Sequence, residues 1–259
     1  MPERVWYIKE CQLFSRLTNE QLARLERRGR MRVFPRSSTI YMPSDANDGV
    51  FLVAEGRVRI SSITPDGKQA ILAFIEPGEL FGELALVESG QREEYAATVM
   101  DSTIVLLPGD ELSRLMAEST ELTLGVTKLM GLRRKRIERR LRSLLFRSNR
   151  ERLTSLLLDL VEQYGRTMVE GVLIEIKLSH QDLASIIGAT RETVTVLLGE
   201  MQLEGLLQVS RQRLVVRNLK RLADGIEVPV PAIAEKRRAV PVRRAAPVVG
   251  LDPPNSGEV

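Results

Sequence analysis

The chain has 259 residues, of which 43% are hydrophobic and 28% charged, and its formal net charge is +4. This length is enough for two ordinary domains with separate cores, and the composition is typical of globular proteins. No apolar run reaches the roughly 18 residues that a membrane-spanning helix requires, and the N-terminus does not resemble a signal peptide. We therefore expect a cytoplasmic protein with no membrane partner, and the mildly basic charge admits nucleic acid as a partner.

One cysteine, Cys11, and one histidine, His180, restrict the possible cofactors. These counts exclude an iron–sulfur cluster held by four thiolates and a zinc site of Cys and His ligands. Haem is not expected, because the N-terminal half contains no histidine. The same absence argues against a cupin-like enzyme, and only His180 could serve as the base for a nucleophile. We predict no metal site and no enzymatic activity.

The N-terminal half changes from helical to strand-like patterns. Residues 1–30 are predicted to be helical, with Thr18 as an N-cap. From about residue 32 to 107, short apolar runs separated by turn residues predict a β-sandwich or jelly-roll barrel, with Gly67 in a hairpin turn. Asp110 is expected to cap a short helix after the last strand. The predicted strands are 50–53, 58–60, 70–75, 97–99 and 103–107.

A long helix without proline is predicted over about residues 120–147. Its apolar residues form an a/d-type seam that is interrupted at Arg133 and Arg134. A helix of about 28 residues spans about 42 Å, which is more than one small domain covers. This length favours a dimer seam over packing on the helix's own domain. The seam consists of Val126, Met130, Ile137, Leu141 and Leu144.

Two closely spaced helices are predicted after Leu178. Ser179 and Thr190 are good N-caps, and Gly188 between the helices can take the left-handed conformation. Ala184 is small enough for the second helix to approach, and Val194 supplies a β-branched core residue. Together these positions predict a helix-turn-helix motif, rather than an ordinary structural corner.

The second helix has the features of a recognition helix, whose first residues enter the major groove. Arg191 can donate two hydrogen bonds to guanine and Glu192 can accept from cytosine, and Thr195 completes the predicted base contacts. Residues 206–209 and 214–216 are predicted to form a hairpin with a basic tip, which makes the region a winged helix. The predicted phosphate contacts are Ser179, His180, Gln181, Thr190, Thr193, Arg211 and Arg213.

Four segments are expected along the chain. Residues 1–119 form a sensor domain, and residues 120–147 form the dimerisation helix and hinge. Residues 148–223 form the DNA-binding domain, and residues 224–259 form a basic, proline-rich tail without regular structure. The expected fold class is α+β.

Three stretches carry a resemblance to the Crp/Fnr family of bacterial regulators. LFSRLTNEQLARL resembles the family's opening helix, and PGELFGELALVESG (77–90) resembles the phosphate-binding cassette of cyclic-nucleotide-binding domains. LSHQDLASIIGATRETVTVLLGEMQLEGLL (178–207) resembles the family's helix-turn-helix closely. The resemblance implies a homodimer that reads a palindromic promoter site on double-stranded DNA under effector control, with RNA polymerase as a further partner.

The sensor pocket departs from the family's nucleotide-binding pattern. Tyr95 and Ala96 stand where the cassette normally supplies an Arg-Ser pair to the phosphate, and Arg92 lies slightly earlier. A phosphate without its arginine loses a strong charge-assisted contact. The effector could therefore be cyclic AMP or a 2-oxoglutarate-like anion. A third possibility is that the sensor binds no effector and serves as a dimerisation scaffold for a constitutive DNA-binding protein. The candidate effector contacts are Gly82, Glu83, Leu84, Arg92, Tyr95, Ala96, Ile137 and Glu138.

Overall fold

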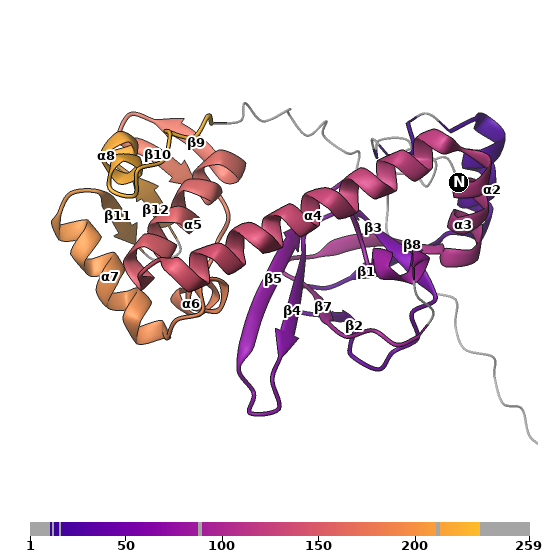
Figure 1. The fold of residues 1–259 in the computed structure, drawn as a ribbon, viewed down its shortest axis with the longest axis horizontal. Helices are drawn as coiled ribbons and strands as arrows, with labels where there is room; N and C mark the ends of the chain where they lie inside the picture. Colours follow the sequence, from indigo (N-terminus) through magenta and orange to yellow (C-terminus); the bar gives the residue numbers. More distant parts are fainter. Residues whose placement is uncertain (1–10, 12, 16, 88–89, 211–212, 234–259) are drawn as a thin grey trace, which may run out of the picture.

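The structure, a computed structural model, describes residues 11, 13–15, 17–87, 90–210 and 213–233. These residues form a β-rich N-terminal domain and a smaller mixed C-terminal domain. The long helix α4 (Thr120–Phe146) runs from the first domain to the second (Figure 1). The predicted α+β class is confirmed, and α4 follows the predicted helix almost residue for residue.

The N-terminal domain is a sandwich of two four-stranded antiparallel sheets, ordered β1-β8-β3-β6 and β2-β7-β4-β5. Buried residues from both sheets meet between them, including Val53 and Ile104 of one sheet and Ile60 and Ile75 of the other. The jelly-roll expectation is therefore confirmed. The strands are β1 (Arg30–Phe34), β2 (Thr39–Tyr41), β3 (Gly49–Glu55), β4 (Val58–Ile63), β5 (Gln69–Ile75), β6 (Leu80–Phe81), β7 (Tyr95–Thr98) and β8 (Ser102–Pro108).

Three helices cover the outer face of the β1-β8-β3-β6 sheet: α2 (Asn19–Arg28), α3 (Gly109–Glu118) and the start of α4. Their apolar residues share one core with those of β3 and β8. Thr18 caps α2 as predicted, in a reciprocal capping box with Gln21. The prediction for α3 was wrong, because Pro108 is its N-cap, and Asp110 lies in the first turn and pairs with Arg28 instead.

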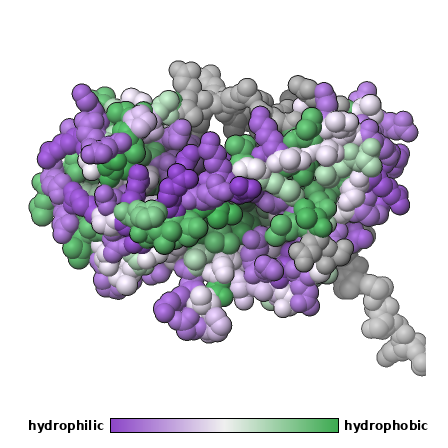
Figure 2. Space-filling model, in the orientation of Figure 1, coloured by the Kyte–Doolittle hydropathy of each residue, from purple (hydrophilic) through white to green (hydrophobic). Residues whose placement is uncertain are grey.

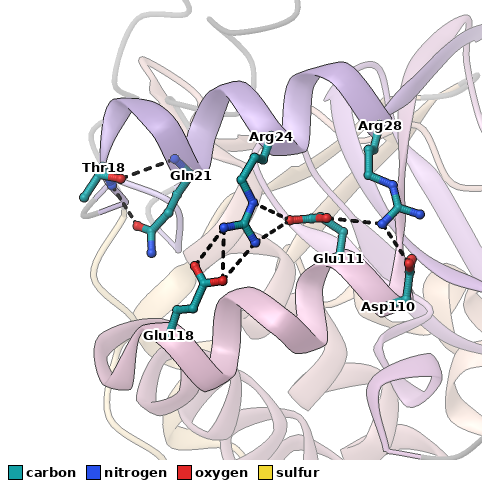
Figure 3. Close-up of polar contacts among 7 residues, drawn as sticks. All are labelled: Thr18, Gln21, Arg24, Arg28, Asp110, Glu111 and Glu118. Carbon is teal, nitrogen blue, oxygen red and sulfur yellow. Dashed lines mark hydrogen bonds and ion pairs between the residues drawn. The ribbon is translucent and has the colours of Figure 1, made fainter.

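Charged side chains join α2 to α3 (Figure 3). The Glu111 side chain is almost fully buried and accepts a hydrogen bond of 2.9 Å from Nε of Arg24 and one of 3.2 Å from Nη1 of Arg28. Arg24 also binds Glu118, at 3.0 Å. Burial raises the pKa of the Glu111 carboxyl, but the bonds from Arg24 and Arg28 lower it more, so the net pKa lies below its usual value.

We expect Glu111→Gln to lower the free energy of unfolding by about 1–3 kcal/mol at pH 7, because two guanidinium groups lose their buried acceptor charge. A carboxyl whose folded pKa is depressed stabilises the fold above its unfolded pKa of about 4.3, and this contribution is lost as the pH falls through the folded pKa. Denaturant unfolding from pH 7 down to pH 3 should therefore show the difference between the two proteins shrinking. An equal free energy of unfolding at pH 7 would contradict the role assigned to Glu111.

The C-terminal domain packs four helices around a third four-stranded sheet, ordered β11-β12-β10-β9. Strands β11 and β12 form the predicted wing hairpin. Strand β10 pairs with β12 on one side and with a further strand, β9, on the other. The elements are α5 (Asn149–Tyr164), β9 (Gly165–Met168), β10 (Gly171–Ile174), α6 (His180–Ile187), α7 (Arg191–Leu203), β11 (Leu207–Ser210), β12 (Arg213–Val216) and α8 (Leu219–Asp224).

The residues that follow α8 form no helix or strand as far as residue 233, but they are not detached from the domain. Ile226, Val228 and Ile233 pack against the C-terminal core. The packed region therefore extends beyond Asp224, because these apolar side chains bury surface on the domain. The rest of the predicted tail, residues 234–259, lies outside the described residues.

The predicted seam of α4 divides into two parts. Val126 is buried and Met130 partly buried in the core of their own N-terminal domain, so this part of α4 packs on that domain. Ile137 and Leu141 are 67% and 55% exposed. Figure 2 shows apolar surface in a band across the middle of this face, in the region where α4 runs.

Candidate DNA-binding surface and effector site

Local chemistry fixes the two helices of the helix-turn-helix. Ser179 caps α6 in a capping box with Asp182, and Thr190 caps α7 by accepting a bond from the Thr193 backbone. Gly188 ends α6 with φ of 68°, a left-handed conformation that glycine adopts without strain. The two N-caps and the turn glycine stand where the sequence predicts them.

The N-terminal tip of α7, residues 191 and 192, is not buried in the C-terminal domain. Val194, Leu198 and Met201 are buried and anchor the helix to the C-terminal core. Arg191 and Glu192 are exposed at the first turn. A helix tip with this exposure has room to enter the major groove, whereas a tip packed inside the domain would not.

Thr195 is exposed, but its hydroxyl is engaged within the chain. Its Oγ1 donates to the backbone oxygen of Arg191 at 2.9 Å and lies 2.8 Å from Nδ1 of His180. The contact with His180 connects the first turn of α6 to the second turn of α7. Thr195 is therefore positioned by His180, and its methyl group is the part left for an apolar contact.

The start of α6 and the wing lie next to each other. Ser179, the N-cap of α6, and His180 line a cavity of about 360 Å³ together with Ser210 and Arg213 of the wing. Most of the other lining residues are apolar, but these four polar ones come from two neighbouring elements, so both elements could contact one stretch of DNA backbone. Of the other predicted phosphate contacts, Gln181, Thr190 and Thr193 lie in the first turns of α6 and α7 or just before them, and Arg211 lies outside the described residues.

Gly82 and Arg92 of the predicted effector site are in contact. Arg92 is only 6% exposed, and it donates to the backbone oxygen of Gly82 at 3.0 Å and to that of Gly49 at 2.6 Å. Its guanidinium lies over the rings of Tyr41 and Phe51, and its Nε is buried without a hydrogen-bond partner. Burial lowers the pKa of Arg92. A buried guanidinium with an unused donor is a candidate partner for an anion.

The long helix adds a residue that the sequence analysis did not include in the pocket. Arg133 of α4 pairs with Glu83, which follows Gly82, and also donates to the backbone oxygen of Leu80. Nearby, the hydroxyl of Tyr41 donates to Glu94 at 3.1 Å, and burial raises the pKa of the Glu94 carboxyl. Acidic and basic groups therefore converge between the barrel and α4.

The other predicted effector contacts are placed less favourably. Glu138 is exposed and pairs with Arg134 one turn back on α4, so it does not reach the barrel. Ile137 lies on the face of α4 that carries Arg133 but remains exposed. Leu84 is exposed, Tyr95 is half-buried, and Ala96 is fully buried between the sheets. The places of the missing Arg-Ser pair thus supply no cation.

Contacts between the two domains were also absent from the sequence analysis. Glu76, at the end of β5, accepts a bond from the hydroxyl of Tyr164 on α5 at 2.8 Å and pairs with Arg57. Arg59 of β4 lies 3.4 Å from Asp182 of α6. Arg140 of α4 donates to backbone oxygens of β5 and of α6. The β4–β5 hairpin and α4 therefore hold the first helix of the helix-turn-helix.

Among the described residues, no three potential metal-binding side chains form a cluster, and none of the helices combines the length and apolar character that spanning a bilayer requires.

Comparisons with known proteins agree with this architecture. Residues 31–119 match the cyclic nucleotide-binding domain family, and residues 151–224 match the Crp-like helix-turn-helix domain family. The global nitrogen regulator of Synechocystis sp. is 30% identical over 187 residues, which cover 71% of this chain and 83% of that protein. The CRP-like cAMP-activated global transcriptional regulator of Mycobacterium tuberculosis is 26% identical over 190 residues, which cover 73% and 85%.

A solved structure is similar as well. A Crp/Fnr-family transcriptional regulator from Thermus thermophilus has 26% sequence identity and a TM-score of 0.65, and the match covers 76% of this chain and 98% of that one. The fold and the helix-turn-helix together define a DNA-binding transcription regulator whose N-terminal domain is of the effector-binding, cyclic nucleotide-binding type. The chain belongs to the Crp/Fnr family, whose members are regulators and not enzymes.

Proposed function

We propose that the protein is a homodimer that binds a palindromic promoter site, and that a small effector between the barrel and α4 controls this binding. The exposed tip of α7, beside the start of α6 and the wing, is the observation that carries the proposal. Arg191 and Glu192 read base edges, and Thr195 adds a contact from the next turn. The phosphate contacts are Ser179, His180, Gln181, Thr190, Thr193, Arg211 and Arg213.

Selection from random DNA duplexes tests this function. The expected product is a palindrome whose half-sites lie one helical turn apart, about 34–36 Å, because a two-fold dimer presents two recognition helices to successive major grooves. Enrichment of no sequence, with only salt-sensitive non-specific binding, would contradict the proposal.

The proposed effector is a small organic anion. Arg92 and Arg133 are basic groups of the barrel and of α4, and Arg92 has an unused Nε. An anion that bound here would compete with Glu83 for Arg133 and so change how α4 contacts the barrel. One relative is cAMP-activated, as its name states, and cyclic AMP and 2-oxoglutarate are both suitable probes by charge and size.

Calorimetric titration with cyclic AMP and with 2-oxoglutarate tests the effector site. We expect one of them to bind, and Arg133→Gln to weaken that binding at least tenfold, because a charge-assisted contact is lost. Arg134→Gln is the matched control, since Arg134 is exposed and pairs only with Glu138 among the described groups. Equal binding by both variants would contradict the role of Arg133.

The alternative function is a constitutive DNA-binding protein whose sensor domain serves as a dimerisation scaffold. The absence of a cation at Tyr95 and Ala96 favours it. Tight operator binding by a protein that binds neither probe would support this alternative.

The proposed functional units of the chain are a sensor domain to residue 119, a dimerisation helix and hinge at 120–147, and a DNA-binding domain at 148–223. Contacts of Glu76 with Tyr164, and of Arg140 with α6, support coupling between effector and DNA, because a change at the barrel or α4 alters what holds α6. RNA polymerase is a further proposed partner.

A further inference from the structure

The exposed face of α7 carries an apolar side chain where polar ones are usual. Val196 is 59% exposed, although Val194 and Leu198 on the same helix are buried. Glu192, Val196 and Gly199 follow at spacings of four and three residues, so they lie along one face of α7. Val196 is therefore placed one turn beyond the proposed base contact of Glu192.

Gly199 provides an independent observation on the same face. Glycine inside a helix lowers helix stability relative to alanine. A Cβ added at Gly199 would meet no atom of the chain within 4 Å, so packing within the protein does not require glycine there. The missing side chain instead lets a partner approach the backbone of α7 closely.

The charges around this face also suit DNA. Glu200 of α7 and Glu204, the C-cap residue of α7, lie 3.4 Å and 2.7 Å from the guanidinium of Arg150 on α5. The pairing with Arg150 reduces the repulsion between this part of α7 and phosphates.

We propose that Val196 contacts the C5-methyl group of a thymine in the major groove, and that Gly199 allows α7 to lie close enough for this contact. Valine has no hydrogen-bonding group, so placing it against guanine, adenine or cytosine edges would desolvate donors or acceptors without replacing their bonds. Thymine alone presents a methyl group in that groove. This inference rests on the proposed function and adds a thymine to the polar readout by Arg191 and Glu192.

The methyl group can be removed from the DNA without changing the base pairing. Each thymine of the selected half-site is replaced in turn by deoxyuridine, symmetrically in both half-sites, and the dissociation constant is measured. At one thymine we expect affinity to fall about fourfold per half-site, as for the loss of one buried methyl group. Val196→Ala is expected to weaken binding to the thymine duplex and to abolish the difference between thymine and uracil at that position.

Two further variants separate readout from folding. Leu203→Ala, at the exposed end of α7, is the matched control and is expected to retain the discrimination between thymine and uracil. Gly199→Ala is expected to weaken operator binding while its melting temperature stays equal or rises, since the new Cβ points into open space in the free protein. A change that merely damaged the fold would lower both.

The outcomes distinguish this inference from the function on which it rests. If Val196→Ala discriminates against uracil at every position as strongly as the wild type does, Val196 does not read a thymine methyl group. If the wild-type protein selects an operator that shows no sensitivity to uracil, only the inference about Val196 fails. If the wild-type protein selects no operator, the proposed function fails as well.

Discussion

Arg191→Ala is expected to weaken binding of the selected palindrome by about 30-fold to 10⁴-fold. A bidentate contact between arginine and guanine contributes roughly 1–3 kcal/mol of discrimination, and a dimer makes the contact twice, so the loss is about 2–6 kcal/mol per palindrome. Arg191 is exposed at the first residue of α7 and is not part of the C-terminal core. Its removal should therefore affect DNA and leave the fold intact.

The measurement must separate base readout from the loss of one positive charge. Arg27→Ala removes the same charge from an exposed position on α2, in the other domain, and should bind the operator as the wild type does. In fluorescence anisotropy titrations, Arg191→Ala should also lose the preference for guanine over adenine at one position of each half-site. Equal affinity of wild type and Arg191→Ala for the operator would exclude Arg191 as a base contact.

Features that depend on residues close together in the sequence were predicted correctly, and features that depend on distant residues were not. Thr18, Ser179, Thr190 and Gly188 were predicted correctly because caps and left-handed turns depend on residues three or four positions apart. The α3 cap was mispredicted because Asp110 bonds to Arg28, which lies 82 residues away in the chain. A long-range partner of this kind overrides a local preference.

The contacts between domains also could not be predicted from local sequence patterns. Tyr164 and Glu76 are separated by 88 residues, and neither has a local pattern that marks it as a partner of the other. The short strands β2 and β6 have three and two residues, too few to show an alternating pattern. Elements of this size are defined by the sheets that they join.

The effector side of α4 could have been predicted in part. Arg133 and Arg140 are seven residues apart and share the face of Val126, which the apolar spacing had assigned to the dimer seam. The same two arginines reach the barrel and α6. Ile137 and Glu138 were chosen from the family pattern instead. Helical periodicity places Ile137 on the same face as the two arginines but places Glu138 away from it.

Leu141→Glu is expected to convert the protein to a monomer and to weaken binding to the palindrome by at least 100-fold. Leu141 is 55% exposed and lies beside Leu145 and Ile137, which are also exposed. In the proposed dimer these apolar side chains face their copies, and a glutamate at each Leu141 would place two like charges in that seam. Two linked half-site binders gain about 10²–10⁴ in affinity over separate ones, and a monomer loses this gain.

Leu132→Glu is the matched control for this prediction. Leu132 is 49% exposed on α4 but is nine residues before Leu141, which places it on the opposite side of the helix at 100° per residue. Light scattering should give a dimer mass for the wild type and for Leu132→Glu, and a monomer mass for Leu141→Glu. Because a monomer keeps its recognition helix, Leu141→Glu should bind an isolated half-site as tightly as one wild-type protomer does, and a dimeric Leu141→Glu would show that α4 does not form the seam.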